Sequence, residues 1–287
     1  MKKILSILFA LLWVISLNAQ VLTVYKSGRV LYCTAYTDSI VVTRAIPNAA
    51  TESAFAVSDN SYVCFSPGNL QYHIATGTWR FADYQYDYVA ADITDTTYTG
   101  WIDLFGWGTG NNPTNVEDAN SKFTDWGTNA IGTDVANTWR TLTLDEWLYL
   151  FQHTRWTLAK VNGTLGFMLL PDSFETPVGL SVSILGDGNL TDASKNYSES
   201  DYSTNIYNSD EFVSLESAGA IFLPAAGARY GTNLSVCGQK GIYWTATTGT
   251  SKYAARYMSF IVTKALVSVN NHAARKYGYS VRLVRDL

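Results

Sequence analysis

The residue types that most often perform covalent chemistry are sparse and scattered along this sequence. Cys33, Cys64 and Cys237 lie far apart, so they form no CxxC motif of a redox or zinc site. Three cysteines allow at most one disulfide. A Cys64–Cys237 bridge is one alternative, and three small buried thiols are the other. The cysteines therefore select no redox or zinc chemistry.

The sequence also lacks the residue patterns of a metal site or a hydrolase active site. The three histidines, His73, His153 and His272, do not stand at the spacing of metal ligands. Residues 187–192 offer oxygen ligands, but they lack the full acidic pattern of a calcium loop. The sequence has no GxSxG motif and no Gly-rich phosphate loop, and nothing selects a catalytic pair among its 24 Asp and Glu residues. We therefore expect no metal, no cofactor and no enzyme active site.

Recognition is the chemistry that the composition favours. The chain has nine Trp and nineteen Tyr residues, while only 15% of its residues are charged. Such a chain can build a dense core and still leave aromatic rings at its surface. Exposed Tyr and Trp side chains suit binding, because they offer a large contact area and lose little conformational entropy.

Two segments have the pattern of a helix that could help to position such residues. The stronger runs over residues 143–153, where Thr143 and Glu146 have the spacing of a capping box. Apolar residues from Leu144 to Phe151 follow at helical spacing. The weaker segment covers residues 209–217 and has two acidic residues in its first turn.

Short strands and loops fill most of the remaining sequence. The Gly- and Trp-rich residues 100–110 are expected to form an irregular loop pinned by buried Trp rings, and residues 179–210 a long surface excursion. Strands are predicted at residues 220–223, 241–246, 254–262, 262–269 and 280–284. These patterns predict an α+β domain with two main helices, short twisted β-strands and much irregular loop.

The beginning of the chain has the pattern of a secretory signal peptide. Residues 1–19 combine a cationic start, a short apolar run and a small residue at the expected cleavage site. We predict a small N-terminal β-segment at residues 20–45, a linker at 46–53 and the main domain at 54–287. The mature protein is expected to be exported to the cell surface, the periplasm or the extracellular space.

The charge of the expected mature chain argues against two classes of partner. Removal of residues 1–19 leaves 18 Lys and Arg against 24 Asp and Glu, with no basic cluster. A mildly acidic protein of this kind is not expected to bind nucleic acid. Without a polybasic stretch or a second long apolar run, it is not expected to stay in a membrane after cleavage.

Three motifs in the main domain resemble those of known domains. Residues 139–149 resemble the helix-start signature of formylglycine-generating-enzyme domains, with Leu142 and Leu148 as departures. Residues 219–229, 243–247 and 278–285 are similar to segments of the bacterial major paralogous domain surface proteins. The residues that match the helix signature are also expected to be structural: Arg140, Thr143, Glu146, Trp147 and Tyr149.

The resemblance implies a C-type-lectin-like fold whose C-terminal loops form the binding face. The matching segment here, residues 247–279, contains Tyr, Asn and Arg side chains that suit stacking and directional hydrogen bonding. The oxidase members of this fold use two reactive cysteines, and only Cys237 stands in the corresponding third of the chain. With the Trp of the YW motif, the candidate ligand-binding residues are Trp244, Tyr253, Arg256, Tyr257, Asn270, Asn271, His272, Arg275, Lys276 and Tyr277.

The sequence thus favours an exported, non-catalytic recognition module that binds a glycan or a protein ligand in cell-surface adhesion. A periplasmic or secreted enzyme of the formylglycine-generating-enzyme fold is one alternative, and it would need a convergent acid pair or a reactive thiol in a deep pocket. A structural subunit of a surface assembly is the other, with residues 20–45 as the docking piece.

Overall fold

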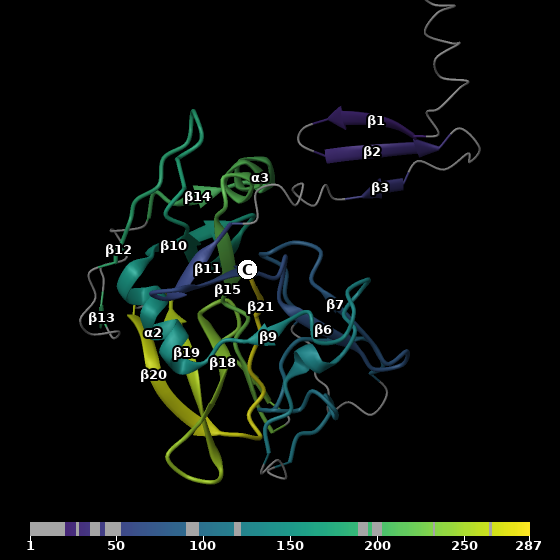
Figure 1. The fold of residues 1–287 in the computed structure, drawn as a ribbon, viewed down its shortest axis with the longest axis vertical. Coiled ribbons are helices and arrows are strands. Elements are labelled where there is room, and N and C mark those ends of the chain that lie inside the picture. Colours follow the sequence, from purple (N-terminus) through teal and green to yellow (C-terminus); the bar gives the residue numbers. More distant parts are fainter. Residues whose placement is uncertain are drawn as a thin grey trace, which may run out of the picture. The chain divides into compact units, whose positions relative to one another are not determined.

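The computed structural model describes most of the chain and divides it into two compact units, residues 1–51 and 52–287. The predicted signal peptide lies outside the described residues, as does most of the predicted linker. The described residues are 21–26, 29–34, 41–43, 53–89, 98–117, 122–188, 195–196, 203–231, 233–263 and 266–287 (Figure 1).

The described residues of the first unit form one antiparallel sheet of three strands. Strand β1 (Val21–Lys26) pairs with β2 (Arg29–Thr34), and β2 pairs in turn with β3 (Val41–Thr43). The alternation of apolar and polar residues around the turn at residues 27–28 predicts this pairing.

The second unit is built from several small sheets, of which three contain four or five strands. The first has the order β4 (Phe55–Ser58), β5 (Ser61–Phe65), β21 (Leu283–Asp286) and β9 (Arg140–Thr141). The second has the order β12 (Gly186–Asp187), β10 (Arg155–Val161), β11 (Thr164–Leu170) and β15 (Ile221–Pro224), and β14 (Ile206–Tyr207) pairs with β10. The third has the order β13 (Lys195–Asn196), β20 (Leu266–Ala274), β19 (Ala254–Ile261) and β18 (Lys240–Thr248).

Two smaller sheets complete the described strands of this unit. One has the order β7 (Thr78–Phe81), β6 (Leu70–His73) and β8 (Trp101–Ile102). The other is the hairpin of β16 (Ala228–Tyr230) and β17 (Asn233–Ser235). Nearly all of these pairings are antiparallel, and the pairing of β10 with β14 is parallel.

Both predicted helices are present, and local sequence accounts for each. Helix α2 (Leu144–His153) begins with the predicted capping box, in which Thr143 and Glu146 satisfy each other's backbone N–H groups. Helix α3 (Ser209–Ser217) has a second capping box, made by Asn208 and Glu211. Each helix buries one face, as its apolar spacing predicts.

The predicted α+β class, with a C-type-lectin-like fold built on two main helices, is wrong. Helices α2 and α3 contain only ten and nine residues, and small antiparallel sheets make up most of the ordered structure in the described residues. Capped helices give strong local signals, whereas strands of two to four residues are too short to show an alternating pattern. The sequence pattern therefore located both helices but understated the share of strand.

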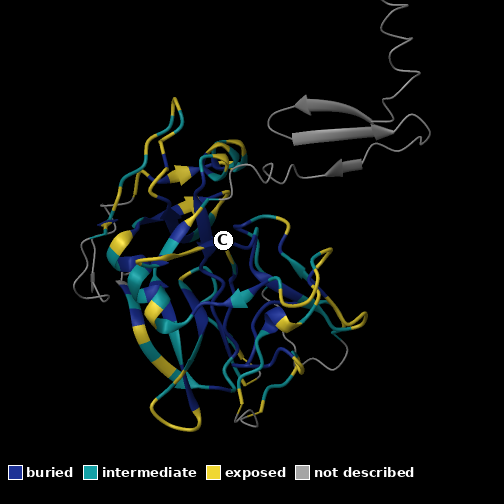
Figure 2. Cartoon of the chain, viewed as in Figure 1, coloured by how far each residue is buried: buried dark blue, intermediate teal, exposed yellow. Residues whose placement is uncertain are grey.

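Strand β18 and much of β19 are buried on both faces, because they lie between two hydrophobic clusters, whereas Asn270 and His272 of β20 are exposed. Tyr243, Met258 and Phe260 point into the cluster around helix α2. Ile242 and Trp244 point the opposite way, into a cluster that also contains Trp107 and Trp126. Figure 2 shows buried residues along the central strands, and exposed residues at the loop tips and along part of β20. Because successive strand residues face opposite sides, one strand serves both clusters.

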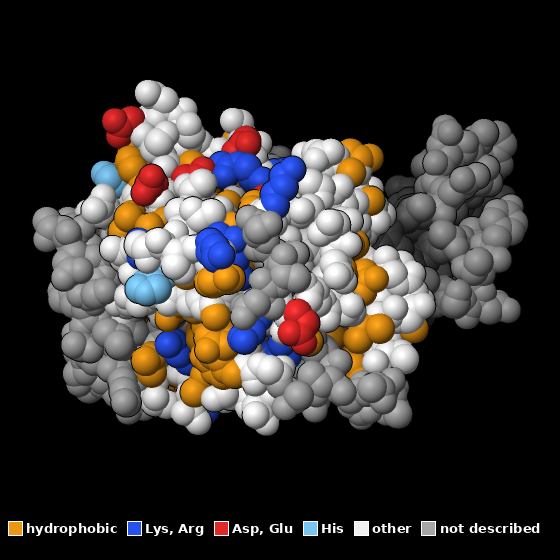
Figure 3. Space-filling view, turned by 90° about the horizontal axis from the view of Figure 1, so that it is seen from below, with side chains coloured by type: hydrophobic (Ala, Val, Ile, Leu, Met, Phe, Trp, Pro, Cys, Tyr) orange, Lys and Arg blue, Asp and Glu red, His pale blue; other side chains and the backbone are white. Residues whose placement is uncertain are grey.

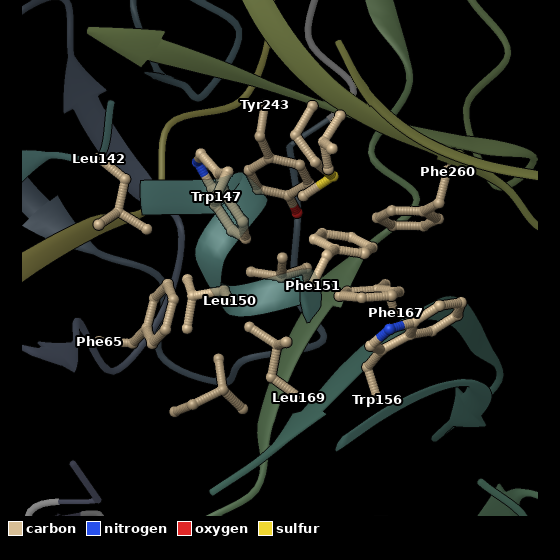
Figure 4. Packing of buried hydrophobic residues seen from close by; sticks show 14 of the residues in the cluster. Phe65, Leu142, Trp147, Leu150, Phe151, Trp156, Phe167, Leu169, Tyr243 and Phe260 are labelled. Carbon is tan, nitrogen blue, oxygen red and sulfur yellow. The ribbon is translucent and has the colours of Figure 1, made fainter. Parts of the chain in front are cut away.

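Aromatic rings fill the first cluster (Figure 4). The Phe167 ring lies between three others, with ring centroids 5.2 Å from Phe151, 5.3 Å from Trp156 and 5.5 Å from Phe260. Phe167 is completely buried on β11. Each of these rings comes from a different element, so the cluster joins helix α2, the β10–β11 hairpin and strand β19.

We expect the substitution Phe167→Ala to lower the free energy of unfolding by about 3–5 kcal/mol, because it removes a buried ring and leaves a cavity. Urea unfolding followed by Trp fluorescence measures this change. The matched control is Val178→Ala, at a fully exposed position, which should change stability by less than about 0.5 kcal/mol. Equal effects of the two substitutions would contradict this description of the core.

Candidate ligand-binding site

Strand β18 places Trp244 at the base of the candidate site. Trp244 is 1% exposed, its indole N–H donates to the carbonyl oxygen of Phe105 at 2.7 Å, and its ring centroid lies 4.4 Å from that of Tyr279. A side chain so buried, with its only donor used, supports a surface rather than contacting a ligand. Trp244 therefore acts here as an internal brace for the residues above it.

Four tyrosine rings gather beside Trp244, and we call Tyr230, Tyr257, Tyr277 and Tyr279 the tyrosine platform. Tyr279 is buried, and the other three are partly exposed. The ring centroids are 4.8 Å apart for Tyr230 and Tyr277, and 5.1 Å apart for Tyr257 and Tyr279. Both pairs are edge-to-face, which is a favourable arrangement for aromatic rings.

A backbone pairing between distant segments fixes the platform. Arg229 and Gly278 exchange two backbone hydrogen bonds, of 2.9 and 2.8 Å, which bring Tyr230 beside Tyr277 and Tyr279. A Cβ atom on Gly278 would lie only 2.8 Å from Nε of Arg229, so this close approach requires glycine. The platform thus depends on two segments almost fifty residues apart, β16 and the residues before β21.

The hydroxyls of Tyr257 and Tyr279 stay protonated over the physiological pH range, because the pKa of each is raised. Burial, followed by the neighbouring Tyr230, raises the pKa of Tyr257 above its ordinary value. Burial also raises the pKa of Tyr279 strongly, and Tyr230 and Tyr257 add to that shift because phenolate charges would repel one another. A neutral phenol can both donate and accept hydrogen bonds, so the partly exposed Tyr257 can serve polar ligand atoms of either kind.

Arg275 and Trp107 tie the end of β20 to the rest of the site. The guanidinium carbon of Arg275 lies 4.3 Å from the Trp107 ring centroid, and Nε of Arg275 donates to the carbonyl oxygen of Ala254 at 3.0 Å. The backbone N–H of Arg275 donates to Tyr253 at 3.0 Å, and the indole N–H of Trp107 donates to Thr245 at 2.8 Å. Arg275 is only 6% exposed, so it holds the β18–β19 hairpin tip in place rather than reaching toward solvent.

The remaining predicted site residues divide between the two faces of the sheet. Tyr257 and Asn271 are opposite each other in the register of β19 and β20, and so are Arg256 and His272. Because neighbouring residues of a strand point to opposite faces, Arg256 and His272 face away from Tyr257. Arg256 instead donates to Oδ1 of Asn270 at 3.0 Å.

Two further predicted residues lie on loops next to the platform. Tyr253 is 55% exposed at the β18–β19 hairpin tip, with the Nζ atom of Lys252 lying 4.8 Å from its ring centroid. Lys276 is partly exposed between Arg275 and Tyr277. The accessible part of the candidate site therefore consists of the partly exposed platform rings with Tyr253 and Lys276 beside them.

The motif at the start of helix α2 forms a connected polar network. Arg140 donates to both carboxylate oxygens of Glu146, at 3.0 and 2.7 Å, and also binds Asp286 next to the C-terminal residue. Glu146 in turn accepts from the backbone and hydroxyl of Thr143. Trp147 is buried in the first cluster, and the hydroxyl of Tyr149 donates to Asp59 at 3.0 Å. These contacts are all within the protein and join β9, β21 and α2.

The cysteines show no sign of a reactive thiol or a disulfide within the described residues. Cys64 and Cys237 are not joined by a disulfide, and the side chain of Cys33 lies outside the described residues. Burial raises the pKa of Cys64 to about 11, and burial together with the charge of Asp103 raises the pKa of Cys237. A raised pKa lowers the fraction of nucleophilic thiolate at neutral pH.

Metal-binding groups are also missing from the described residues, where no three His, Cys, Asp or Glu side chains converge. The possible calcium ligands at residues 189–192 lie outside the described residues. None of the helices in the described residues has both the length and the hydropathy needed to span a bilayer.

Three residues of the site were not among the sequence candidates: Tyr230, Tyr279 and Trp107. Trp107 is 1% exposed in the Gly- and Trp-rich loop, as that loop's composition predicted, whereas Trp101 is partly exposed. Tyr230 follows the 219–229 motif directly, and Tyr279 ends the predicted binding segment. Their proximity comes from the Arg229–Gly278 pairing, for which the sequence offers no local signal.

Comparison with known proteins gives a partial match. The profile of a domain family of unknown function, DUF8237, matches residues 186–284, which include strands β18, β19 and β20. No curated protein and no solved structure matches the chain. The resemblance to formylglycine-generating-enzyme domains and to major paralogous domain proteins remains a prediction from the motifs.

Asp103, which directly follows strand β8, is a buried ionisable group outside the tyrosine platform. It is 1% exposed; its Oδ2 accepts from the backbone N–H of Val89 at 2.6 Å, and its Oδ1 has no hydrogen-bond partner among the described residues. Burial raises the pKa of this carboxyl from 3.8 to about 7. The folded state therefore disfavours the ionised form, and the free energy of unfolding falls as pH rises through this window.

The substitution Asp103→Asn keeps a side-chain acceptor for Val89 but cannot ionise. We expect the variant to match the wild-type protein near pH ~4 and to be more stable than it by a few kcal/mol above pH ~7. Urea unfolding of both proteins across this pH range measures the difference. A stability difference that stays constant with pH would contradict a raised pKa at Asp103.

Proposed function

We propose that this protein is an exported, non-catalytic module that binds a glycan through the tyrosine platform. The observation that supports this most is the group of partly exposed tyrosine rings held over the buried Trp244 and Tyr279. The export itself rests on the signal-peptide pattern of residues 1–19, and it would place the protein at the cell surface, in the periplasm or outside the cell.

The chemistry of the platform suits a sugar ring. A tyrosine has a flat apolar face and a polar hydroxyl, so it can pack against the C–H face of a pyranose and hydrogen-bond its hydroxyl groups. The protonated hydroxyl of Tyr257, which is partly exposed, offers both a donor and an acceptor. Asn271 is opposite Tyr257 in the register of β19 and β20, and Lys276 directly precedes Tyr277. Both side chains are partly exposed.

The rigidity of the platform favours binding, because fewer side chains must lose freedom when a ligand arrives. The Arg229–Gly278 pairing fixes Tyr230 against Tyr277, and the Arg275–Trp107 contact fixes the hairpin tip at Tyr253. A preorganised surface keeps more of its interaction energy as affinity. Loops on a rigid scaffold are common places for binding sites.

An enzyme is the less favoured alternative. Cys237 and Asp103 interact electrostatically, but the interaction raises the pKa of the thiol and so opposes its activation.

A structural subunit of a surface assembly is the other alternative, and self-association that depends on residues 20–45 would support it.

We expect Tyr277→Ala to weaken binding of the tightest ligand on a glycan array by about tenfold or more, because it removes a partly exposed ring of the platform. The dissociation constant, measured by biolayer interferometry on the mature protein, tests this. Tyr277→Phe should keep part of the affinity, since it keeps the ring and loses only the hydroxyl.

The matched control is Tyr62→Ala, because Tyr62 is 47% exposed on strand β5 and belongs to a different sheet. This variant should bind as the wild-type protein does. Unchanged binding by a correctly folded Tyr277→Ala protein would exclude the platform as the site. Binding to a protein partner alone, with no glycan recognised, would contradict the proposed ligand class.

A further inference from the structure

The charges of this chain are strongly segregated along its sequence. Residues 217–285 contain nine Lys and Arg residues and no Asp or Glu, whereas the other residues contain eleven Lys and Arg against 24 Asp and Glu. The cationic segment includes strands β15 to β20 and almost all of β21. An acidic protein thus carries its candidate binding region on a part of the chain that has no acidic side chain at all.

Only some of these cations can act at the surface. Arg229, Arg275 and Arg282 are buried within the fold. Lys252 is exposed at the β18–β19 hairpin tip, and Lys276 is partly exposed immediately before Tyr277. These two lysines lie on segments that contact each other, because the backbone N–H of Arg275 donates to Tyr253. We call Lys252 and Lys276 the cationic rim of the platform.

The lower face of the molecule agrees with this arrangement. The hairpin tip and the turn after β20 lie at the lower end of the molecule in Figure 1. Figure 3 views the molecule from below and shows hydrophobic side chains gathered near the middle, with Lys and Arg side chains around them. Most acidic side chains lie nearer one edge of this view, and one lies beside the central Lys and Arg side chains. A neutral aromatic centre with cations beside it favours a ligand that is partly apolar and negatively charged.

We propose that the ligand of the tyrosine platform is a glycan that carries carboxylate or sulfate groups. This inference rests on the proposed function, and it adds the charge of the ligand. The platform rings pack against the sugar ring, while the ammonium groups of the rim bind its anionic substituents. Phenol hydroxyls that remain protonated donate further hydrogen bonds to the same oxygens.

The absence of acidic residues from this segment has a physical consequence for selectivity. An anionic ligand approaching the platform meets no carboxylate from residues 217–285, so like-charge repulsion from this part of the site is removed. The acidic remainder of the chain repels anions elsewhere on the surface. The combination directs an anionic glycan toward the platform and reduces its contact with other faces.

The test uses the full mature protein on a glycan array that holds neutral, uronic-acid-containing, sialylated and sulfated glycans at equal density. The inference predicts binding to acidic glycans and at least about tenfold weaker binding to their neutral counterparts. Three soluble polymers with the same backbone serve as a second set. Dextran is uncharged, carboxymethyl dextran carries carboxylates, and dextran sulfate carries sulfates. The two charged forms show which anionic group is preferred.

Salt and charge reversal give two further measurements on the acidic glycan that binds most tightly. Raising the NaCl concentration from about 50 to about 300 mM should weaken binding at least about threefold, because the rim contacts are exposed and screened.

The double variant Lys252→Glu, Lys276→Glu should weaken binding of the same glycan about tenfold or more. The control, Lys160→Glu, reverses an exposed charge on strand β10 and should leave binding unchanged.

The outcomes separate this inference from the proposed function. If Tyr277→Ala abolishes binding but neutral and acidic glycans bind equally and salt has no effect, the platform is the site and the anionic ligand is wrong. If no glycan binds, or only an acidic protein binds, both proposals are overturned. If Lys160→Glu weakens binding as much as the rim variant, the effect is one of net charge and the inference also falls.

Discussion

The burial of strand β18 between two hydrophobic clusters is the constraint on which the rest of the structure depends. Tyr243 and Phe260 fill one cluster, and Trp244 fills the other, so the sheet cannot shift by one residue without placing side chains in the wrong cluster. This fixed register holds Trp244 beneath Tyr279, and through it the partly exposed tyrosines. The surface that we propose for binding is the edge of a core rather than a separate loop structure.

The local part of this structure could be predicted from the sequence, and the non-local part could not. Both α-helices follow from capping boxes and apolar spacing, which act within a few residues. The fold class failed because the short strands are set by long-range pairing, as between β5 and β21. Successive residues of a strand point to opposite faces, so Arg256 and Tyr257 lie on different faces of the sheet. The sequence pattern predicted one binding surface for both, because they are neighbours in the chain. Tyr230 reaches the platform because the preceding residue, Arg229, pairs with Gly278, and this pairing is long-range.

Tyrosine serves two purposes in this site: buried tyrosines pack in the core, and partly exposed ones form the surface. Tyr243 and Tyr279 are buried and pack within the clusters, whereas Tyr230, Tyr257 and Tyr277 continue the same aromatic packing to the surface. Arg275 is similar, since its guanidinium stacks on Trp107 inside the fold while Lys276 beside it reaches solvent. Residues 217–285, which contain all four platform rings, have no Asp or Glu, whereas the whole chain has a formal net charge of −4.

The central claim is that the partly exposed platform rings contact the ligand directly and in a conformation already present without it. Proton–carbon NMR spectra of the protein labelled with ¹³C only in its tyrosine rings, recorded during titration with the acidic glycan that binds most tightly, test this most directly. Our account predicts that the ring signals of Tyr230, Tyr257 and Tyr277 shift on binding, while those of Tyr62 and Tyr149 do not. Shifts confined to tyrosines outside the platform, or platform rings that show no ordered packing in the free protein, would contradict it.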